Sequence, residues 1–154
     1  MKMRAAAVQY HLHSISSFDE FAAQAEHYVK TAQEFETEFL LFPEFFTTQL
    51  LSIPDEQGNA RGIESLPDYT SAYLDLFRRL SSASNMHIVA GTHVIRREGK
   101  LYNTAHLFYP DGRVASQEKI HITPTEVHEW NMAEGDGLAV FETDKGTVAL
   151  LTCY

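Results

Sequence analysis

The sequence predicts a layered α/β domain, and three observations support that prediction. In the first half of the chain, short apolar segments with strand character alternate with two longer segments of helical periodicity. The second half is a run of strand-like segments separated by turns that contain glycine. The 154 residues, 44% of them apolar, are enough for one hydrophobic core, and no linker or repeat divides them. Alternating strands and helices followed by hairpin-like strands are typical of helices packed on a sheet.

The first strand and the first helix are expected within residues 4–35. The segment RAAAVQY, residues 4–10, is short and apolar and predicts a strand. Ser17 and Glu20 have the spacing of a capping box, which marks the start of a helix. Apolar residues then recur at helical spacing on one face, namely Phe18, Phe21, Ala22, Ala25, Tyr28, Val29, Ala32 and Phe35. This segment therefore predicts an amphipathic helix.

A buried strand, a loop and a second helix are expected next. The continuously apolar run FLLF, residues 39–42, predicts a strand that is covered on both faces. Residues 47–64 are polar and contain one proline and two glycines, which predicts a loop. A second helix is predicted from Leu66, with Pro67 near its first turn. Its apolar face consists of Tyr69, Tyr73, Leu76, Phe77 and Leu80.

The rest of the chain predicts a series of strands. MHIVAGTHVI (86–95), LYNTAHLFY (101–109) and RVASQEKI (113–120) have strand character and are separated by turns. FET (141–143), a DKG turn and TVALLTCY (147–154) complete the series. His87 and His93 are six positions apart, so an uninterrupted strand would place both on one face, where they would pack.

Charge, cysteine content and hydropathy exclude several classes of protein. The 21 acidic and 12 basic residues give a formal charge of −9, which argues against a nucleic-acid or anionic-membrane partner. Cys153 is the one cysteine, so no intrachain disulfide forms and a reducing, cytoplasmic location is expected. The first 14 residues hold only a short apolar patch, and no run approaches the ~18 apolar residues of a membrane span. We therefore expect a soluble cytoplasmic protein.

Three chemically distinct residues stand at the ends of predicted strands. Glu44 lies in the otherwise apolar segment LLFPEFF, where a buried unpaired carboxylate would be costly. Lys119 closes the segment RVASQEK, and Cys153 closes TVALLTC. If these strand ends meet at one edge of a sheet, they supply a nucleophile, a base and a cation. A lone cysteine is also often a small buried hydrophobe, and a charged residue at a strand end often points to water, so the residues alone leave both interpretations open.

Several segments resemble the motif blocks of the nitrilase, or carbon–nitrogen hydrolase, superfamily, and they occur in the order of that family. They are FLLFPEFF, EKIHITPTEVHEW, GDGLAVFET and VALLTCY. The resemblance implies that Glu44 is the general base, that Lys119 stabilises the oxyanion and that Cys153 attacks. Glu126, seven positions after the lysine, resembles the second glutamate that orients the substrate and the lysine. The implied fold is a four-layer α-β-β-α sandwich, and residues 1–154 resemble the N-terminal half of that domain, truncated just after the nucleophile.

The resemblance also implies a reaction. We expect thiol-dependent hydrolysis of a non-peptide C–N bond, in a small amide, through an acyl thioester on Cys153. Acyl transfer to an amine, nitrile hydrolysis and an inactive half-domain that serves as a binding or assembly module are the alternatives. The backbone N–H of Tyr154 is a second candidate oxyanion donor. His128 and Trp130 are expected at the mouth of the substrate pocket, with packing in the loop as the equal alternative.

We expect no metal, no cofactor and a small-molecule amide or nitrile as substrate. The eight histidines lack the spacing of a zinc site, and Gly135 and Gly137 form a turn with no phosphate-binding helix after it. The family resemblance implies a homo-oligomer. The apparent truncation makes a complementing C-terminal fragment the alternative partner.

Overall fold

The computed structural model describes residues 3–153. The strands are β1 (Ala5–Ala7), β2 (Phe39–Leu41), β3 (His87–Arg97), β4 (Lys100–Phe108), β5 (Val114–Glu118), β6 (Val140–Thr143) and β7 (Gly146–Ala149). The α-helices are α1 (Phe18–Glu34), α2 (Thr70–Ser84) and α3 (Pro124–His128), and two 3-10 segments cover Phe46–Ser52 and Ile63–Tyr69. Within the described range, no helix is both long and apolar enough to cross a membrane.

The direction of the strands brings several strand ends to one edge of the main sheet. This sheet has the order β1-β2-β3-β4-β5. Strands β1, β2 and β3 are parallel, whereas β4 is antiparallel to both β3 and β5. Strands β2, β3 and β5 therefore run in one direction and end at the same edge, where β4 begins. Residues that follow β2 and β5 can meet residues at the start of β4 there.

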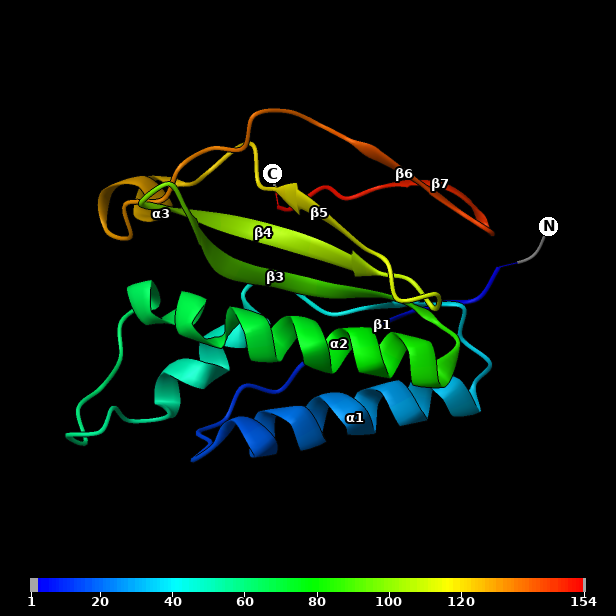
Figure 1. Ribbon diagram of the computed structural model, residues 1–154, viewed down its shortest axis with the longest axis horizontal. Coiled ribbons are helices and arrows are strands. Elements are labelled where there is room, and N and C mark those ends of the chain that lie inside the picture. Colours follow the sequence, from blue (N-terminus) through cyan, green and yellow to red (C-terminus); the bar gives the residue numbers. More distant parts are fainter. Residues whose placement is uncertain (1–2, 154) are drawn as a thin grey trace.

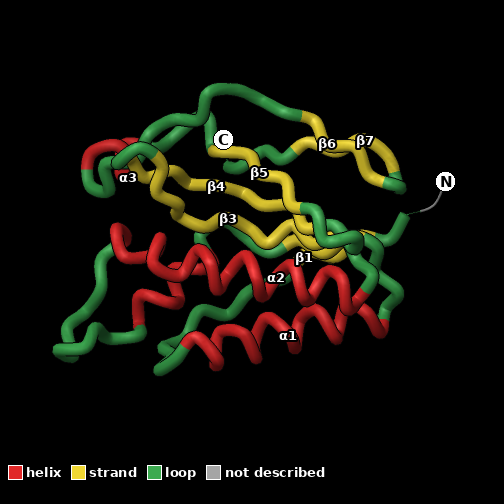
Figure 2. Tube along the Cα trace, in the orientation of Figure 1, coloured by secondary structure: helices red, strands yellow, loops and turns green. Residues whose placement is uncertain are grey.

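The helices and the hairpin cover opposite faces of the main sheet. Helices α1 and α2 lie on one face, and the antiparallel pair β6–β7 lies over the other (Figure 1; Figure 2). The larger core lies between the helices and the sheet, and it includes Phe21, Tyr73 and Phe77, each 0% exposed. A smaller cluster under the hairpin contains Ala105, Leu107, Tyr109 and Leu150. The layered α/β prediction is confirmed.

Helix α1 begins where the sequence predicts, but its capping box is only half formed. The hydroxyl of Ser17 accepts a hydrogen bond from the backbone N–H of Glu20, as a capping residue does. The carboxylate of Glu20 accepts from the backbone N–H and the hydroxyl of Ser16, at 3.0 and 2.6 Å, and not from the backbone of Ser17. The acidic side chain therefore stabilises the residue before the cap.

Three predicted boundaries are wrong. Residues 46–52 form a 3-10 segment, in which Phe46 and Leu50 are buried, and not an open loop. The second α-helix begins at Thr70, because Ile63–Tyr69, which includes Pro67, is wound as a 3-10 helix. Strand β7 ends at Ala149, since it pairs with only the four residues of β6. Cys153 therefore lies four residues beyond a strand and does not close it.

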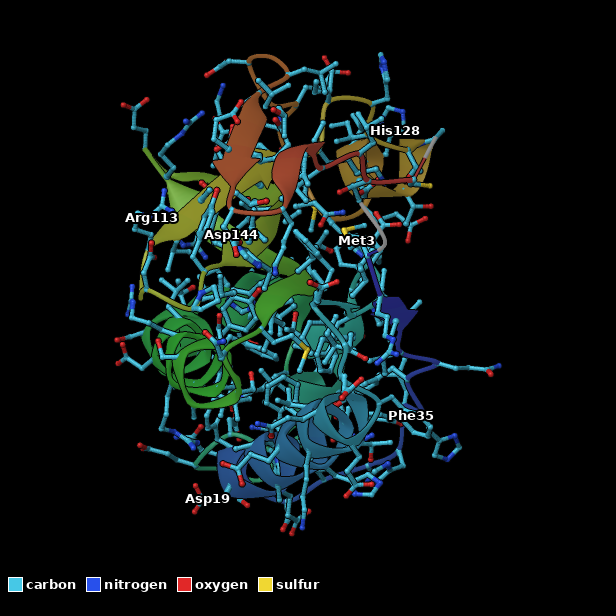
Figure 3. All side chains as sticks on the ribbon, turned by 90° about the vertical axis from the view of Figure 1, so that its right-hand side faces the viewer. Met3, Asp19, Phe35, Arg113, His128 and Asp144 are labelled. Carbon is cyan, nitrogen blue, oxygen red and sulfur yellow. The ribbon has the colours of Figure 1, made fainter. Side chains whose placement is uncertain are left out.

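The two histidines of β3 lie on opposite faces of the sheet, contrary to the prediction. The register of β3 against β4 shifts between Val89 and Thr92, and this bulge reverses the alternation of side chains. His87 faces the hairpin, where its Nε2 is 3.4 Å from a carboxylate oxygen of Asp144. Asp144 lies in the turn between β6 and β7 (Figure 3). His93 faces α2 instead and stacks on Tyr73 with ring centroids 4.6 Å apart.

Candidate active site

Lys119 is the centre of a buried charged cluster at the edge where β5 ends. Its side chain is 2% exposed, and its Nζ lies 2.8 Å from Oε1 of Glu44 and 2.8 Å from Oε2 of Glu126. Its backbone N–H donates to the carbonyl of Asn103 at 2.8 Å, which fixes the residue against the start of β4. A buried ammonium needs such partners, because an unpaired buried charge is costly. The structure thus brings together three of the residues that the sequence analysis selected.

Glu44 reaches this cluster because the chain after β2 crosses closely over β3. At Gly91 in β3, a Cβ atom would lie 2.0 Å from the carbonyl oxygen of Pro43, so no side chain fits there. Gly91 also has a φ of 51°, which glycine adopts without strain. The next residue, Thr92, accepts a hydrogen bond from the backbone N–H of Phe45 through its hydroxyl at 2.9 Å. These contacts fix the backbone on both sides of Glu44.

Glu126 belongs to the short helix α3 and is 1% exposed. Thr123 caps this helix, and the two residues form a complete capping box. Oε2 of Glu126 accepts from the backbone N–H of Thr123 and from Nζ of Lys119, each at 2.8 Å. The same carboxylate therefore holds the start of the helix and the position of the lysine.

Asn103 is a member of the cluster that the sequence analysis did not select. Its side-chain Nδ2 lies 2.9 Å from Oε1 of Glu44 and 2.9 Å from Oε1 of Glu126. The residue is 1% exposed and lies near the start of β4. A polar side chain within the apolar segment LYNTAHLFY was the available signal, because a buried amide needs hydrogen-bond partners.

Hydrogen bonds keep Lys119 and Glu126 ionised. Burial alone would lower the pKa of Lys119, but hydrogen bonds to Glu126 and Glu44 outweigh it and raise this pKa above its ordinary value. Burial alone would raise the pKa of Glu126. Hydrogen bonds from Lys119, from the backbone of Thr123 and from Asn103 outweigh that effect, and the pKa of Glu126 is lowered. The Lys119–Glu126 ion pair is therefore present at neutral pH.

Cys153 borders two pockets that flank the cluster. One pocket, of about 240 Å³, is lined by Glu44, Gly91 and Thr92 together with Cys153. The other, of about 310 Å³, is lined by Lys119 and His121 together with Cys153. Residues Leu150 to Cys153 line both. Cys153 is exposed and has a φ of 58°, an uncommon conformation for a residue with a side chain.

The three expected substrate-binding residues lie elsewhere or outside the described range. Trp130 packs edge-on against Phe45, with ring centroids 5.4 Å apart. His128 is exposed at the end of α3. Neither borders either of the two pockets as residues 3–153 form them, so their contact with substrate stays a prediction. Tyr154 lies outside the described residues. Within the same range, no three His, Cys, Asp or Glu side chains are grouped so as to hold a metal ion.

Comparison with known proteins relates the whole chain to one family. Residues 4–154 match the family described as carbon-nitrogen hydrolase. A probable hydrolase of Bacillus subtilis is 41% identical over 152 residues, which are 99% of this chain and 30% of that protein. An omega-amidase of Bos taurus is 28% identical over 118 residues, which are 69% of this chain and 43% of that protein.

Solved structures share the fold over about half of their length. A carbon-nitrogen hydrolase from Helicobacter pylori G27 has a TM-score of 0.77 at 17% identity, over 98% of this chain and 51% of its own. An amidase from Nesterenkonia sp. has a TM-score of 0.75 at 19% identity, over 99% of this chain and 56% of its own. The predicted nitrilase-like fold is confirmed, and the chain belongs to the carbon-nitrogen hydrolase family.

Proposed function

We propose that this chain supplies the catalytic residues of an enzyme that hydrolyses a non-peptide C–N bond in a small amide. One observation carries the proposal: Glu44 and Lys119, paired at 2.8 Å, each line a pocket, and Cys153 lines both of these pockets. Membership of the family supports the same chemistry. So do structures of the Nesterenkonia amidase, one with acrylamide added at its active-site cysteine and one in complex with butyramide.

In the first half of the reaction, the sulfur of Cys153 attacks the amide carbon. Thiols are mostly protonated near neutral pH, so the S–H proton passes to the carboxylate of Glu44 as the S–C bond forms. The negative charge moves to the amide oxygen. The ammonium of Lys119 has three N–H donors, two of which are used by Glu44 and Glu126, and the third remains for this oxyanion.

In the second half, the tetrahedral species collapses and the C–N bond breaks. Glu44 returns its proton to the nitrogen, so ammonia or an amine leaves and a thioester remains on Cys153. Water then attacks the thioester carbon and gives a proton to Glu44. When the C–S bond breaks, that proton returns to the sulfur, and a carboxylic acid is released. Glu44 acts as base and acid in both halves.

Incubation of the full-length protein with a panel of small aliphatic amides tests this proposal, and the release of ammonia is measured. We expect Cys153→Ala and Glu44→Gln each to lower kcat by about 10²-fold or more, because each removes a group that touches the reacting atoms. The matched control is Glu129→Gln, an exposed glutamate three positions beyond Glu126, which should keep wild-type turnover. Unchanged hydrolysis in both Cys153→Ala and Glu44→Gln would contradict the assignment.

The same assay separates the alternative activities. With an ordinary alkyl amine added at millimolar concentration, formation of its N-substituted amide in place of the free acid would favour acyl transfer to an amine. Turnover of nitriles in place of amides would favour nitrile hydrolysis. A binding or assembly module would turn over neither. The chain spans less than two thirds of the length of the relatives above. We therefore also propose that a second copy or a complementing C-terminal segment completes the working enzyme. We propose a cytoplasmic location for it.

A further inference from the structure

We propose that Asn103 is a positioning residue of the site. Its side-chain amide donates one hydrogen bond to a carboxylate oxygen of Glu44 and one to a carboxylate oxygen of Glu126. The other oxygen of Glu44, Oε2, is then the one that takes the proton from the thiol and returns it. This inference rests on the proposed function, because it assigns a role within that reaction.

The position of Asn103 allows one side chain to reach both carboxylates. Nδ2 of Asn103 is 2.9 Å from Oε1 of Glu44 and 2.9 Å from Oε1 of Glu126. An amide NH₂ has two hydrogens, so each carboxylate receives one. The backbone carbonyl of Asn103 also accepts the N–H of Lys119 at 2.8 Å. Asn103 therefore contacts all three charged members of the cluster.

The orientation of the amide is set by the two carboxylates. The other side-chain atom, Oδ1 of Asn103, is buried and has no hydrogen-bond partner among the described residues. Turning the amide over would point that oxygen at two carboxylate oxygens, which repel it. An unpaired buried acceptor is unfavourable for folding, so an apolar side chain would suit the core better. The asparagine is therefore explained by the carboxylates it holds and not by packing.

This arrangement distinguishes the two oxygens of Glu44. Oε1 accepts from Nζ of Lys119 at 2.8 Å and from Nδ2 of Asn103 at 2.9 Å. Within residues 3–153, no hydrogen bond falls on Oε2. The side chain of Glu44 is 27% exposed and lines the pocket that Cys153 borders. A carboxylate with one oxygen held by two donors has its other oxygen available for the proton of the thiol.

The neutrality of the amide matters as well. Two carboxylates and one ammonium give the cluster a net charge of −1, which leaves one negative charge able to accept a proton. A second cation at position 103 would cancel that charge, and a third carboxylate would repel the other two. An asparagine supplies two donors and leaves the charge unchanged.

Asn103→Leu tests the proposal, since leucine is similar in size and has no donor. We expect kcat to fall about 10²-fold, because Glu44 is no longer held in place, while KM changes by less than about threefold. The loss should fall on kcat and not on KM, because the variant displaces the base and leaves the two pockets lined as before. The matched control is Thr104→Val, the next residue of β4 and 0% exposed, which should keep wild-type kinetics.

A purely structural asparagine would give a different result. Asn103→Leu would then keep the wild-type kcat, and this outcome overturns the proposal. If Asn103→Leu fails to fold by circular dichroism, Asn103→Ser replaces it. Serine is polar but too short to reach both carboxylates, so the same loss of kcat is expected and its absence again overturns the proposal.

A titration separates failure of this inference from failure of the proposed function. In ¹³C-detected NMR, Asn103→Leu should raise the pKa of Glu126, because that carboxylate loses one of its donors. This readout needs no substrate. An unchanged pKa of Glu126 overturns the positioning role even if amides are hydrolysed. If the pKa of Glu126 rises in the variant but the wild-type protein hydrolyses no amide, the hydrogen bond from Asn103 is supported and the proposed reaction is rejected.

Discussion

At the scale of single residues, Glu44 reaches the buried cluster because Gly91 has no side chain. The carbonyl oxygen of Pro43 occupies the space that a Cβ of residue 91 would need, at 2.0 Å, and a ring atom of Phe46 lies 2.8 Å from the same point. The backbone before Glu44 thus lies directly on β3. A catalytic carboxylate positioned by backbone packing moves if that packing changes.

Gly91→Ala should therefore impair both stability and activity. We expect the free energy of unfolding to fall by roughly 1–3 kcal/mol more than in Gly99→Ala, because only Gly91 adds an overlap to the backbone strain. Gly99 is the matched control, since its φ is 80° and nothing lies within 4 Å of the added Cβ. Urea unfolding of the two variants, with amide turnover measured beside it, checks this. Equal destabilisation with full activity in both would contradict the account.

The structure brings together three residues that the motifs select, and their catalytic roles stay predictions. Glu44, Lys119 and Glu126 were selected from segments that resemble family blocks, and the structure joins all three by hydrogen bonds of 2.8 Å. Asn103 was missed because its role depends on two partners that are 59 and 23 positions away in sequence. The need for a glycine at position 91 could not be predicted for the same reason, because it depends on where the carbonyl of Pro43 lies.

At the scale of secondary-structure elements, buried histidines lie between helix α2 and the sheet. His93 stacks on Tyr73 of α2, and its two ring nitrogens face the hydroxyls of Thr47 and Thr70 at 3.2 and 3.1 Å. Burial, with a contribution from His106, lowers the pKa of His93 to about 3. Burial lowers the pKa of His106 to about 4, against a hydrogen bond with Thr104. Both side chains are therefore neutral in the folded protein near neutral pH.

These histidines should make the fold sensitive to mild acid. In the unfolded chain both histidines become protonated below about pH 6.5. In the folded chain His106 is protonated only near pH 4 and His93 only near pH 3. The unfolded state then binds more protons than the folded state. As the pH is lowered, the free energy of unfolding therefore decreases by up to about 1.4 kcal/mol per pH unit for each histidine. The double variant His93→Asn with His106→Asn should lose most of this slope between pH 6.5 and 4.5.

Urea unfolding from pH 8 to 4.5 measures that slope. At pH 7.5–8 the histidines are neutral in both states, so a difference between wild type and the double variant there reports lost packing alone. A slope between pH 6.5 and 4.5 that is the same in both proteins would show that the buried histidines do not control acid stability.

The elements themselves were largely predictable, but irregular backbone was not. The helical faces of α1 and α2 and the apolar strands β2 to β5 follow from periodicity. The bulge near Gly91 reversed the expected placement of His87 and His93, because one extra residue exchanges the two faces of a strand. The polar residues in 47–64 predict a loop, but the first six residues of that range belong to the 3-10 segment Phe46–Ser52, in which Leu50 is buried.

At the scale of the whole molecule, the chain presents large apolar side chains to solvent. Phe35 at the end of α1 is 71% exposed, and Leu151 beside Cys153 is 75% exposed (Figure 3 labels Phe35). In the hairpin, Val140 is 69% exposed. Exposed apolar groups of this size commonly mark surfaces that contact other protein segments. They are surfaces on which the proposed second copy or complementing segment could pack, and Leu151 is the one beside the candidate site.

The layers of the fold position the site as a whole. Glu44, Lys119 and Asn103 come from segments at one edge of the main sheet, and Cys153 arrives from the end of the hairpin that covers the sheet. The four residues after β7, Leu150 to Cys153, line both pockets. The proposed nucleophile and its proposed base thus belong to different layers, so the proposed reaction depends on how those layers pack.

The most direct test of the account is the mass of the peptide that carries Cys153 during turnover. The protein is mixed with a small amide, quenched in acid within the steady state, and digested with trypsin. We predict that the peptide beginning at Gly146 gains the mass of the acyl group and that Cys153→Ala abolishes this gain. Hydrolysis of the amide with no acyl group on that peptide, or equal turnover in Cys153→Ala, would contradict the account.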